Sequence, residues 1–179
     1  MPDPARSTTG VTPDLAAIYE AELPYVWESL RRLGVREADL EDVAHDLFIA
    51  LQRRLPDYDP ARPLRPWLFG FALRVASDYR KSARVRLEVV AAPRDTADAR
   101  PGAEERLAAR EARDLILRAL DSLTLEQRAV LALHDLDGYS MPEIAQALGE
   151  PLNTLYSRLR AARIEFTAAV RRLPAGGEP

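Results

Sequence analysis

Apolar residues recur with a helical period along most of the chain. In the clearest stretch, residues 36–55, seven of them share one arc of a helical wheel: Leu40, Val43, Ala44, Leu47, Phe48, Leu51 and Leu55. Residues three and four positions apart lie on the same face of a helix, so this arc predicts a buried face. No segment alternates β-branched or aromatic residues with polar ones over the length of a strand. The pattern therefore predicts an all-α fold.

The helical pattern is interrupted by a segment rich in Pro, Ala, Asp and Gly. We interpret residues 87–103 as a flexible linker. The linker divides the chain into two small helical domains, residues 12–86 and residues 104–173. Polar and small residues at the two ends predict a disordered tail over residues 1–11 and a second tail over residues 174–179.

Two helix starts in the second domain carry capping boxes. Thr124 and Gln127 form the pattern T-x-x-Q, and Ser140 and Glu143 form the pattern S-x-x-E. The sequence DLDGY between them predicts a turn, because a glycine adopts positive φ without strain. Gly149 is expected to end the helix that starts at Ser140.

A helix-turn-helix is predicted around Gly149. Ala145, Gly149 and Leu155 stand where this motif needs a small residue, a turn residue without a Cβ, and an apolar residue from the second helix. That second helix reaches about Arg172. Its outward side carries Asn153, Ser157, Arg160, Ile164 and Arg171, with Tyr156 and Arg163 on one flank and Arg158 on the other. A plain surface helix with basic residues near its C-terminus is the alternative. It does not explain the capping boxes and the glycine together.

The helix over residues 36–55 has a second face, opposite the apolar arc. Asp39, Asp42, Asp46 and Arg53 surround Ile49 there. One interpretation is a solvated acidic face with a single exposed apolar residue. The other is a docking face for a basic partner, with an apolar centre and a charged rim.

A further helix is predicted from Pro66 to about Arg84, with the proline at its first position. Its apolar arc holds Trp67, Leu68, Phe71, Val75 and Tyr79, and a neighbouring basic arc holds Gly70, Arg74, Ser77, Lys81 and Arg84. Cations beside aromatic rings suit single-stranded nucleic acid, since cations hold phosphates and rings stack on bases. Alternatively, the rings belong to the core and the arginine stems cover apolar surface. Gly70 would let another backbone approach closely.

Composition limits the possible functions. The 179 residues are 47% hydrophobic and 30% charged, as in soluble globular proteins. No apolar run resembles a signal peptide or a membrane span, so we expect a cytoplasmic protein. The net charge of -3 disfavours a free-standing nucleic-acid coat protein. Because the chain has two histidines, no cysteine and no Gly-rich phosphate loop, we expect no enzyme, no cofactor and no metal site.

Three motifs of the chain resemble bacterial RNA polymerase sigma-70 family factors of the extracytoplasmic function (ECF) group. They read DLEDVAHDLFIALQRRL, RPWLFGFALRVASDYRK and LTLEQRAVLALHDLDGYSMPEIAQALGEPLNTLYSRLRAAR, and they cover nearly all of the two domains. Members of this group keep two conserved domains, sigma-2 and sigma-4. The resemblance implies that residues 12–86 are sigma-2 and residues 104–173 are sigma-4.

The resemblance also implies functions for three surfaces. The core polymerase-binding face, which meets the clamp helices of the largest catalytic subunit, is Asp39, Asp42, Asp46, Ile49 and Arg53. The residues that melt and read the -10 element are Trp67, Gly70, Arg74, Ser77, Arg80, Lys81 and Arg84. The residues that read the -35 element in the major groove are Asn153, Thr154, Tyr156, Ser157, Arg158, Arg160 and Arg163. Further expected partners are the flap of the second-largest polymerase subunit, promoter DNA and an anti-sigma factor.

The sequence departs from the family pattern at three of these positions. Arg74 stands where many members have asparagine, and Asn153 and Tyr156 stand where a glycine and a basic residue are frequent. Two other functional classes fit the residues taken alone. One is a helix-turn-helix regulator that binds an operator without polymerase, and the other is an adaptor whose acidic face binds another protein.

Overall fold

A computed structural model describes the backbone of residues 14–87 and 104–173 and the side chains of residues 14–82 and 112–173. Within these ranges the chain is helical and contains no strand, so the predicted all-α fold is confirmed. The predicted linker, apart from Leu87, and both predicted tails lie outside the described residues.

The first three helices form one packed unit. Helices α1 (Leu15–Arg32), α2 (Leu40–Arg54) and α3 (Leu64–Leu87) contact one another in all three pairings. Short 3-10 turns, η1 (Glu37–Asp39) and η2 (Leu55–Asp57), flank α2. The apolar arc predicted for α2 is buried at every position except Leu55, which is half-buried. The period of the sequence therefore identified the core face of this helix.

Helix α3 differs from its prediction in two ways. It begins at Leu64, so Pro66 is its third residue rather than its first. The first four N–H groups of a helix have no intrahelical partner, which is why a proline is tolerated there. Its buried residues include Phe69, Ala72 and Ala76, which the predicted arc left out. The buried face is wider than expected because α3 packs against α1 and α2 and also against α5 and α6.

The second unit contains α4 (Glu104–Leu120), α5 (Leu125–Leu131), α6 (Met141–Leu148) and α7 (Leu152–Arg172). Both predicted capping boxes are present. Gln127 N–H donates to Thr124 Oγ1 at 3.3 Å, and Thr124 N–H donates to Gln127 Oε1 at 2.9 Å. Ser140 N–H donates to Glu143 Oε2 at 2.8 Å. These local bonds set the N-termini of α5 and α6.

Part of the segment between α5 and α6, predicted as a turn, is helical. A π-helical turn, η3 (Ala132–Leu136), continues directly from α5. Its wider hydrogen bond runs from Asp137 N–H to Ala132 O at 2.9 Å. Gly138 follows with φ of 79°, as the sequence predicted. The turn is therefore shorter than DLDGY, and Asp135 belongs to a helical element.

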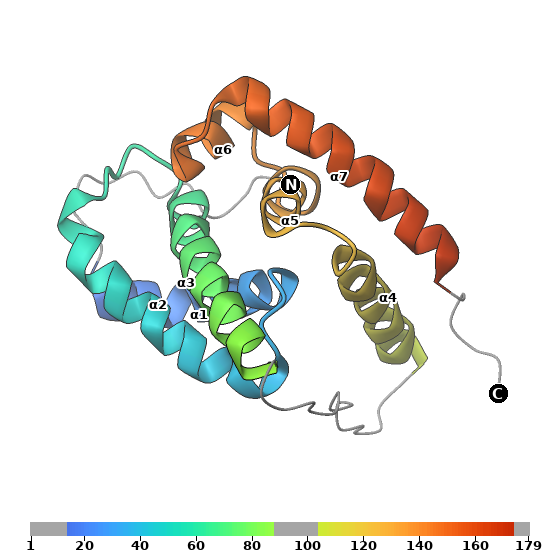
Figure 1. The fold of residues 1–179 in the computed structure, drawn as a ribbon. Helices are drawn as coiled ribbons and strands as arrows, with labels where there is room; N and C mark the ends of the chain where they lie inside the picture. Colours follow the sequence, from blue (N-terminus) through green and yellow to red (C-terminus); the bar gives the residue numbers. More distant parts are fainter. Residues whose placement is uncertain (1–13, 88–103, 174–179) are drawn as a thin grey trace.

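The two units pack against each other (Figure 1). Helix α6 lies beside α3, α5 also touches α3, and α4 touches α1. One close approach is at Gly70 of α3, where a Cβ would stand 3.2 Å from the carbonyl oxygen of Ala147 in α6. The missing side chain lets the two helices meet, as expected for Gly70. The partner that approaches is the chain's own second unit.

Candidate nucleic-acid and protein interfaces

The acidic face of α2 is open to solvent. Asp42, Asp46 and Arg53 are exposed, and Ile49 among them is 40% exposed, whereas Leu40 on the opposite side is fully buried. An exposed isoleucine inside a ring of charged side chains has the anatomy of a docking surface. We call Asp42, Asp46, Ile49 and Arg53 the α2 face.

Asp39 does not belong to the α2 face. It sits in the η1 turn, and its Oδ2 accepts hydrogen bonds from Tyr79 Oη at 2.6 Å and from Arg36 Nε at 2.8 Å. Burial, and then the bond to Asp39, raises the pKa of Tyr79. Asp39 therefore joins the start of α2 to α3. A helical wheel that starts at residue 36 places Asp39 among the outward carboxylates, but α2 begins only at Leu40.

An aromatic and cationic surface lies near the N-terminal end of α3. Trp67 packs against Phe71 with ring centroids 5.0 Å apart and against Tyr58 at 4.8 Å. The exposed Arg74 guanidinium lies 5.8 Å from the centre of the Phe71 ring. Rings and guanidinium groups together provide stacking and cation–π partners. We call Trp67, Gly70, Phe71 and Arg74 the α3 face.

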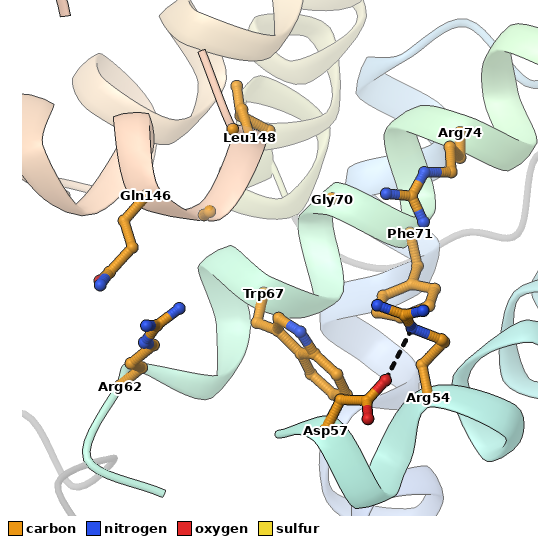
Figure 2. Close-up of a pocket in the computed structure, with 11 residues that line it drawn as sticks. Arg54, Asp57, Arg62, Trp67, Gly70, Phe71, Arg74, Gln146 and Leu148 are labelled. Atoms are coloured by element: carbon orange, nitrogen blue, oxygen red, sulfur yellow. Dashed lines mark ion pairs between the residues drawn. The ribbon is translucent and has the colours of Figure 1, made fainter. Parts of the chain in front are cut away.

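The α3 face forms one wall of a pocket of about 300 Å³ (Figure 2). Arg54, Asp57 and Arg62 complete that wall, and Arg54 pairs with Asp57 at 3.0 Å. The opposite wall comes from the second unit and consists of Gln146, Ala147, Leu148 and Gly149. The three arginines lining the pocket outnumber the single carboxylate, so the pocket favours anionic groups.

The other residues predicted for the -10 element are spread along α3. Ser77 is half-buried, and Lys81 is exposed and pairs with Asp78 at 3.2 Å. Arg80 is partly buried, and its Nη1 atom is buried without a hydrogen-bond partner. The side chain of Arg84 lies outside the described residues. The structure therefore gathers Trp67, Gly70 and Arg74 in the lining of one pocket, of which Ser77, Arg80 and Lys81 are not part.

Helices α6 and α7 form the predicted helix-turn-helix. Gly149 has φ of 68°, and its N–H donates to Ala145 O at 2.9 Å, which ends α6. Leu155 is fully buried in the core, and Ala145 is half-buried beside it. Pro151 is the N-cap residue of α7. Ala145, Gly149 and Leu155 thus serve as the small residue, the turn glycine and the buried apolar residue predicted for the helix-turn-helix.

The outward side of α7 remains open. The exposed residues are Asn153, Tyr156, Ser157 and Arg160, and Tyr156 is 51% exposed. Thr154 is half-buried. Two arginines beside this side bind acidic neighbours: Arg158 Nη1 lies 3.2 Å from Glu150 Oε1, and Arg163 Nη2 lies 2.6 Å from Asp135 Oδ1. We call Asn153, Tyr156, Ser157 and Arg160 the α7 face.

Sequence reasoning missed the residues that join the two units. Asp137, after η3, accepts hydrogen bonds from Tyr25 Oη at 3.0 Å and from Arg32 Nη1 at 2.7 Å, both on α1. Burial, and then Asp137, raises the pKa of Tyr25, so the phenol keeps its proton and donates. Arg128 of α5 is buried, and its guanidinium lies at Gly34 of the first unit, where a Cβ would stand 2.8 Å from Arg128 Nη1. No periodic signal links positions so far apart in sequence.

The described residues offer no metal site and no membrane span. Among side chains 14–82 and 112–173, no group of three or more His, Asp or Glu residues is placed to hold a metal ion. In the same part of the chain, no helix combines the length and apolar character needed to cross a bilayer.

Two family models match the two units. The model described as Sigma-70 region 2 matches residues 18–86, and the model described as Sigma-70, region 4 matches residues 113–166. Among curated proteins, the chain is 35% identical over 149 residues to the RNA polymerase sigma factor NccH of Alcaligenes xylosoxydans xylosoxydans, covering 80% of each chain. It is 34% identical to the ECF RNA polymerase sigma factor SigL of Mycobacterium tuberculosis, covering 83% of this chain and 84% of SigL.

Two solved structures share the fold. The structure of CnrH in complex with the cytosolic domain of CnrY matches with a TM-score of 0.58 and 28% identity, covering 88% of this chain and 87% of CnrH. The sigma factor RpoE of Bartonella quintana, in complex with the anti-sigma factor NepR, matches with a TM-score of 0.65 and 19% identity, covering 89% of this chain and 98% of RpoE. At that identity the second likeness concerns the fold alone.

Proposed function

We propose that three surfaces of this chain divide the tasks of a sigma factor among them. The premise is that the chain belongs to the sigma-70 family of RNA polymerase sigma factors and to its ECF group. As a sigma factor, the protein binds core polymerase and directs promoter-specific transcription initiation by recognising the -35 and -10 elements. In this proposal residues 12–86 are the sigma-2 domain and residues 104–173 the sigma-4 domain. The polymerase performs the chemistry, and this chain supplies recognition without catalysis of its own.

The α2 face is assigned to core polymerase. Its carboxylates complement a basic partner, and Ile49 offers an apolar contact at the centre. In this family the corresponding segment meets the clamp helices of the largest catalytic subunit. Asp39 acts differently in this proposal, since its bonds to Arg36 and Tyr79 position the start of α2. The flap of the second-largest subunit is assigned as a contact of sigma-4.

The α3 face is assigned to the -10 element after strand separation. The half-buried Trp67 ring, backed by the buried Phe71, provides a flat surface on which an unpaired base can stack, and Arg74 and Arg62 offer positive charge to phosphates. Duplex DNA presents no unpaired base to these rings, so the contact forms only as the strands part. The assignment therefore links this face to melting as well as to recognition.

The α7 face is assigned to the -35 element, and it is the observation that carries the proposal best. Gly149 ends α6 in the left-handed conformation, Leu155 anchors α7, and the exposed side of α7 then presents Asn153, Tyr156, Ser157 and Arg160. In a helix-turn-helix the N-terminal residues of the second helix contact base edges in the major groove. Arg160 suits guanine because its two donors reach the O6 and N7 atoms.

Reconstitution with core polymerase tests this division of tasks. The full chain is mixed with core enzyme and a library of promoter fragments, and the transcripts are sequenced. A sigma factor yields transcripts that start at a fixed distance from shared -35 and -10 sequences. Binding to an operator without transcripts would instead support the stand-alone helix-turn-helix regulator. Binding to core enzyme with neither result would support the adaptor.

An anti-sigma factor is proposed as a further partner. The neighbouring structures show CnrH with CnrY and RpoE with NepR, each a sigma factor held by another protein. We propose that this chain is likewise held inactive by a binding protein and acts in the cytoplasm, where core polymerase is found. Co-purification of the tagged chain from its host, followed by inhibition of the reconstituted transcription by the captured protein, tests the proposal.

A further inference from the structure

The pocket between α3 and the end of α6 has the size of a small-molecule site. Its volume of about 300 Å³ lies at the lower end of the range for such sites, about 300 to 1,000 Å³. The first unit lines one wall, and residues 146–149 of the second unit line the other. The two walls differ in their chemistry, and this difference limits the ligands that fit.

The first wall concentrates positive charge. Arg54 pairs with Asp57 at 3.0 Å, and Arg62 pairs with Asp59 at 3.3 Å. Arg74 is exposed, and no carboxylate among the described side chains pairs with it. A guanidinium group binds phosphate oxygens through two parallel N–H donors. The first wall therefore suits a phosphate group, with Arg74 as its main partner.

A flat aromatic surface adjoins these cations. The half-buried Trp67 ring is held by Phe71 and Tyr58, with ring centroids 5.0 Å and 4.8 Å away. A ring that is already held in place loses little freedom when a ligand stacks on it. Bases of every kind stack on such rings, because each base has a flat π-face. The first wall thus offers a place for a base next to a place for a phosphate.

The second wall supplies hydrogen-bond acceptors. The last four carbonyl groups of a helix have no intrahelical partner, and residues 146–148 end α6. The carbonyl oxygen of Ala147 lies close to Gly70, where a Cβ would stand 3.2 Å from it. These carbonyls form the negative end of the helix dipole, which repels a phosphate and attracts N–H donors. The exposed Gln146 side chain points toward Arg62 from this wall (Figure 2). The second wall therefore suits an amino group.

We propose that the pocket binds a free purine mononucleotide with an exocyclic amino group, such as adenosine monophosphate. The phosphate binds Arg74, and the base stacks on Trp67. The amino edge of the base faces Gln146 and the carbonyl oxygens at the end of α6. A purine covers more of an indole ring than a pyrimidine does. A terminal phosphate carries more negative charge at neutral pH than a phosphodiester within a strand, which favours a free nucleotide.

This site is independent of the proposed tasks, but its consequence for transcription rests on the assignment of the α3 face. A nucleotide bound to Trp67 and Arg74 occupies two residues assigned to the -10 element. Free nucleotide and the -10 strand would then compete for one surface. The supply of purine nucleotide would thereby adjust how readily the chain captures single-stranded DNA.

The Trp67 ring can report binding directly. The chain has two tryptophans, so Trp27→Phe leaves Trp67 as the only one. Trp27 is half-buried in α1 and does not line the pocket. Adenosine monophosphate is titrated into the full-length Trp27→Phe chain, where a base stacked on Trp67 should quench its fluorescence. Calorimetry with the wild-type chain should give the same dissociation constant as the quenching.

Three probes each lack one part of the ligand. Adenosine lacks the phosphate, inorganic phosphate lacks the base, and purine riboside monophosphate lacks only the amino group. Each should bind about tenfold more weakly than adenosine monophosphate, the loss expected for one good contact. Equal binding of adenosine monophosphate and purine riboside monophosphate would overturn the proposed orientation. Equal binding of inorganic phosphate would reduce the site to a general attraction for anions and overturn it.

One variant from each wall tests the position of the site. Arg74→Ala and Gln146→Ala should each weaken adenosine monophosphate by about tenfold, because each removes one polar contact. Arg118→Ala on α4 and Gln52→Ala on α2 make the same changes at exposed positions outside the pocket, and they should bind as the wild type does. Thermal unfolding shows that each variant is folded. Unchanged binding by both pocket variants, or no saturable quenching at millimolar nucleotide, would overturn the site.

A competition experiment separates this inference from the assignment of the α3 face. Fluorescence anisotropy follows a fluorescein-labelled single strand that carries the -10 element of a promoter selected in the reconstitution. We expect adenosine monophosphate to displace the strand from the full-length chain. If the nucleotide quenches Trp67 but does not displace a bound strand, the nucleotide site stands and the -10 assignment falls. If the strand binds and the nucleotide does not, the nucleotide site falls and the -10 assignment stands.

Discussion

Arg163 holds both carboxylate oxygens of Asp135. Its Nη2 lies 2.6 Å from Oδ1 and its Nε lies 2.8 Å from Oδ2, so the pair joins the middle of α7 to η3. His134 Nδ1 lies 2.7 Å from the same Oδ1. The bond from Arg163, with help from His134, lowers the pKa of Asp135. Arg163 therefore orients α7 through a contact inside the second unit.

The stability of the chain should respond to acid through Asp135. Its pKa is lower in the folded state than the unfolded value of about 3.9, so its contribution to stability is present above that pH and is lost as pH falls through the folded pKa. Replacement with Asn should flatten the dependence of the unfolding free energy on pH below about 5. Urea unfolding of both proteins from about pH 6 down to pH 3 measures it. Equal slopes in the two proteins would contradict the prediction.

Arg160 and Arg163 should affect promoters differently. Arg160→Ala is expected to relax base preference at one or two adjacent positions of the -35 element, at a cost of about 1 to 3 kcal/mol of discrimination. Arg163→Ala is expected to weaken all promoters about equally, because Arg163 is bound to Asp135 and positions the helix. Transcription of a randomised -35 library by polymerase carrying each variant separates the two. A uniform loss with Arg160→Ala would show that Arg160 contacts the DNA backbone.

The α2 face should control association with core polymerase. Asp46→Arg is expected to slow association, because it reverses the charge offered to a basic partner, whereas Ile49→Ala should mainly speed dissociation. Both side chains are exposed, so folding should not change. Surface plasmon resonance against immobilised core enzyme gives both rate constants. Wild-type rates in folded variants would remove this face from the interface.

Trp67 should matter more for melting than for duplex binding. Removing its ring is expected to cost about 1 to 3 kcal/mol of open-complex stability, the usual value of one base–aromatic stack. Trp67→Phe keeps an aromatic ring and should therefore retain most of the open-complex stability of the wild type. Permanganate footprinting measures strand opening, and gel shifts measure the closed complex. Thermal unfolding is recorded in parallel because Trp67 also packs against Phe71 and Tyr58. Equal losses of both complexes by a stable variant would argue against the assignment.

Some features of this protein could be read from short sequence patterns. The capping boxes at Thr124 and Ser140, the left-handed Gly149 and the buried arc of α2 all appear as predicted. Each depends on residues within a few positions of one another. Errors arose where an element boundary or a second packing surface changed the local pattern. Asp39 lies in a turn before α2, and the buried side of α3 includes Phe69, because α3 is covered by both units.

The helices, the helix-turn-helix and the family follow from local spacing and from motifs that can be compared directly. The residues that join the two units are evident only in the folded chain. Asp137 binds Tyr25 and Arg32 across separations of 112 and 105 residues, and Gly70 faces Ala147 of another helix. A helical period describes which side of a helix is buried, but it does not describe what covers that side. The partner is selected by shape and charge across the whole fold.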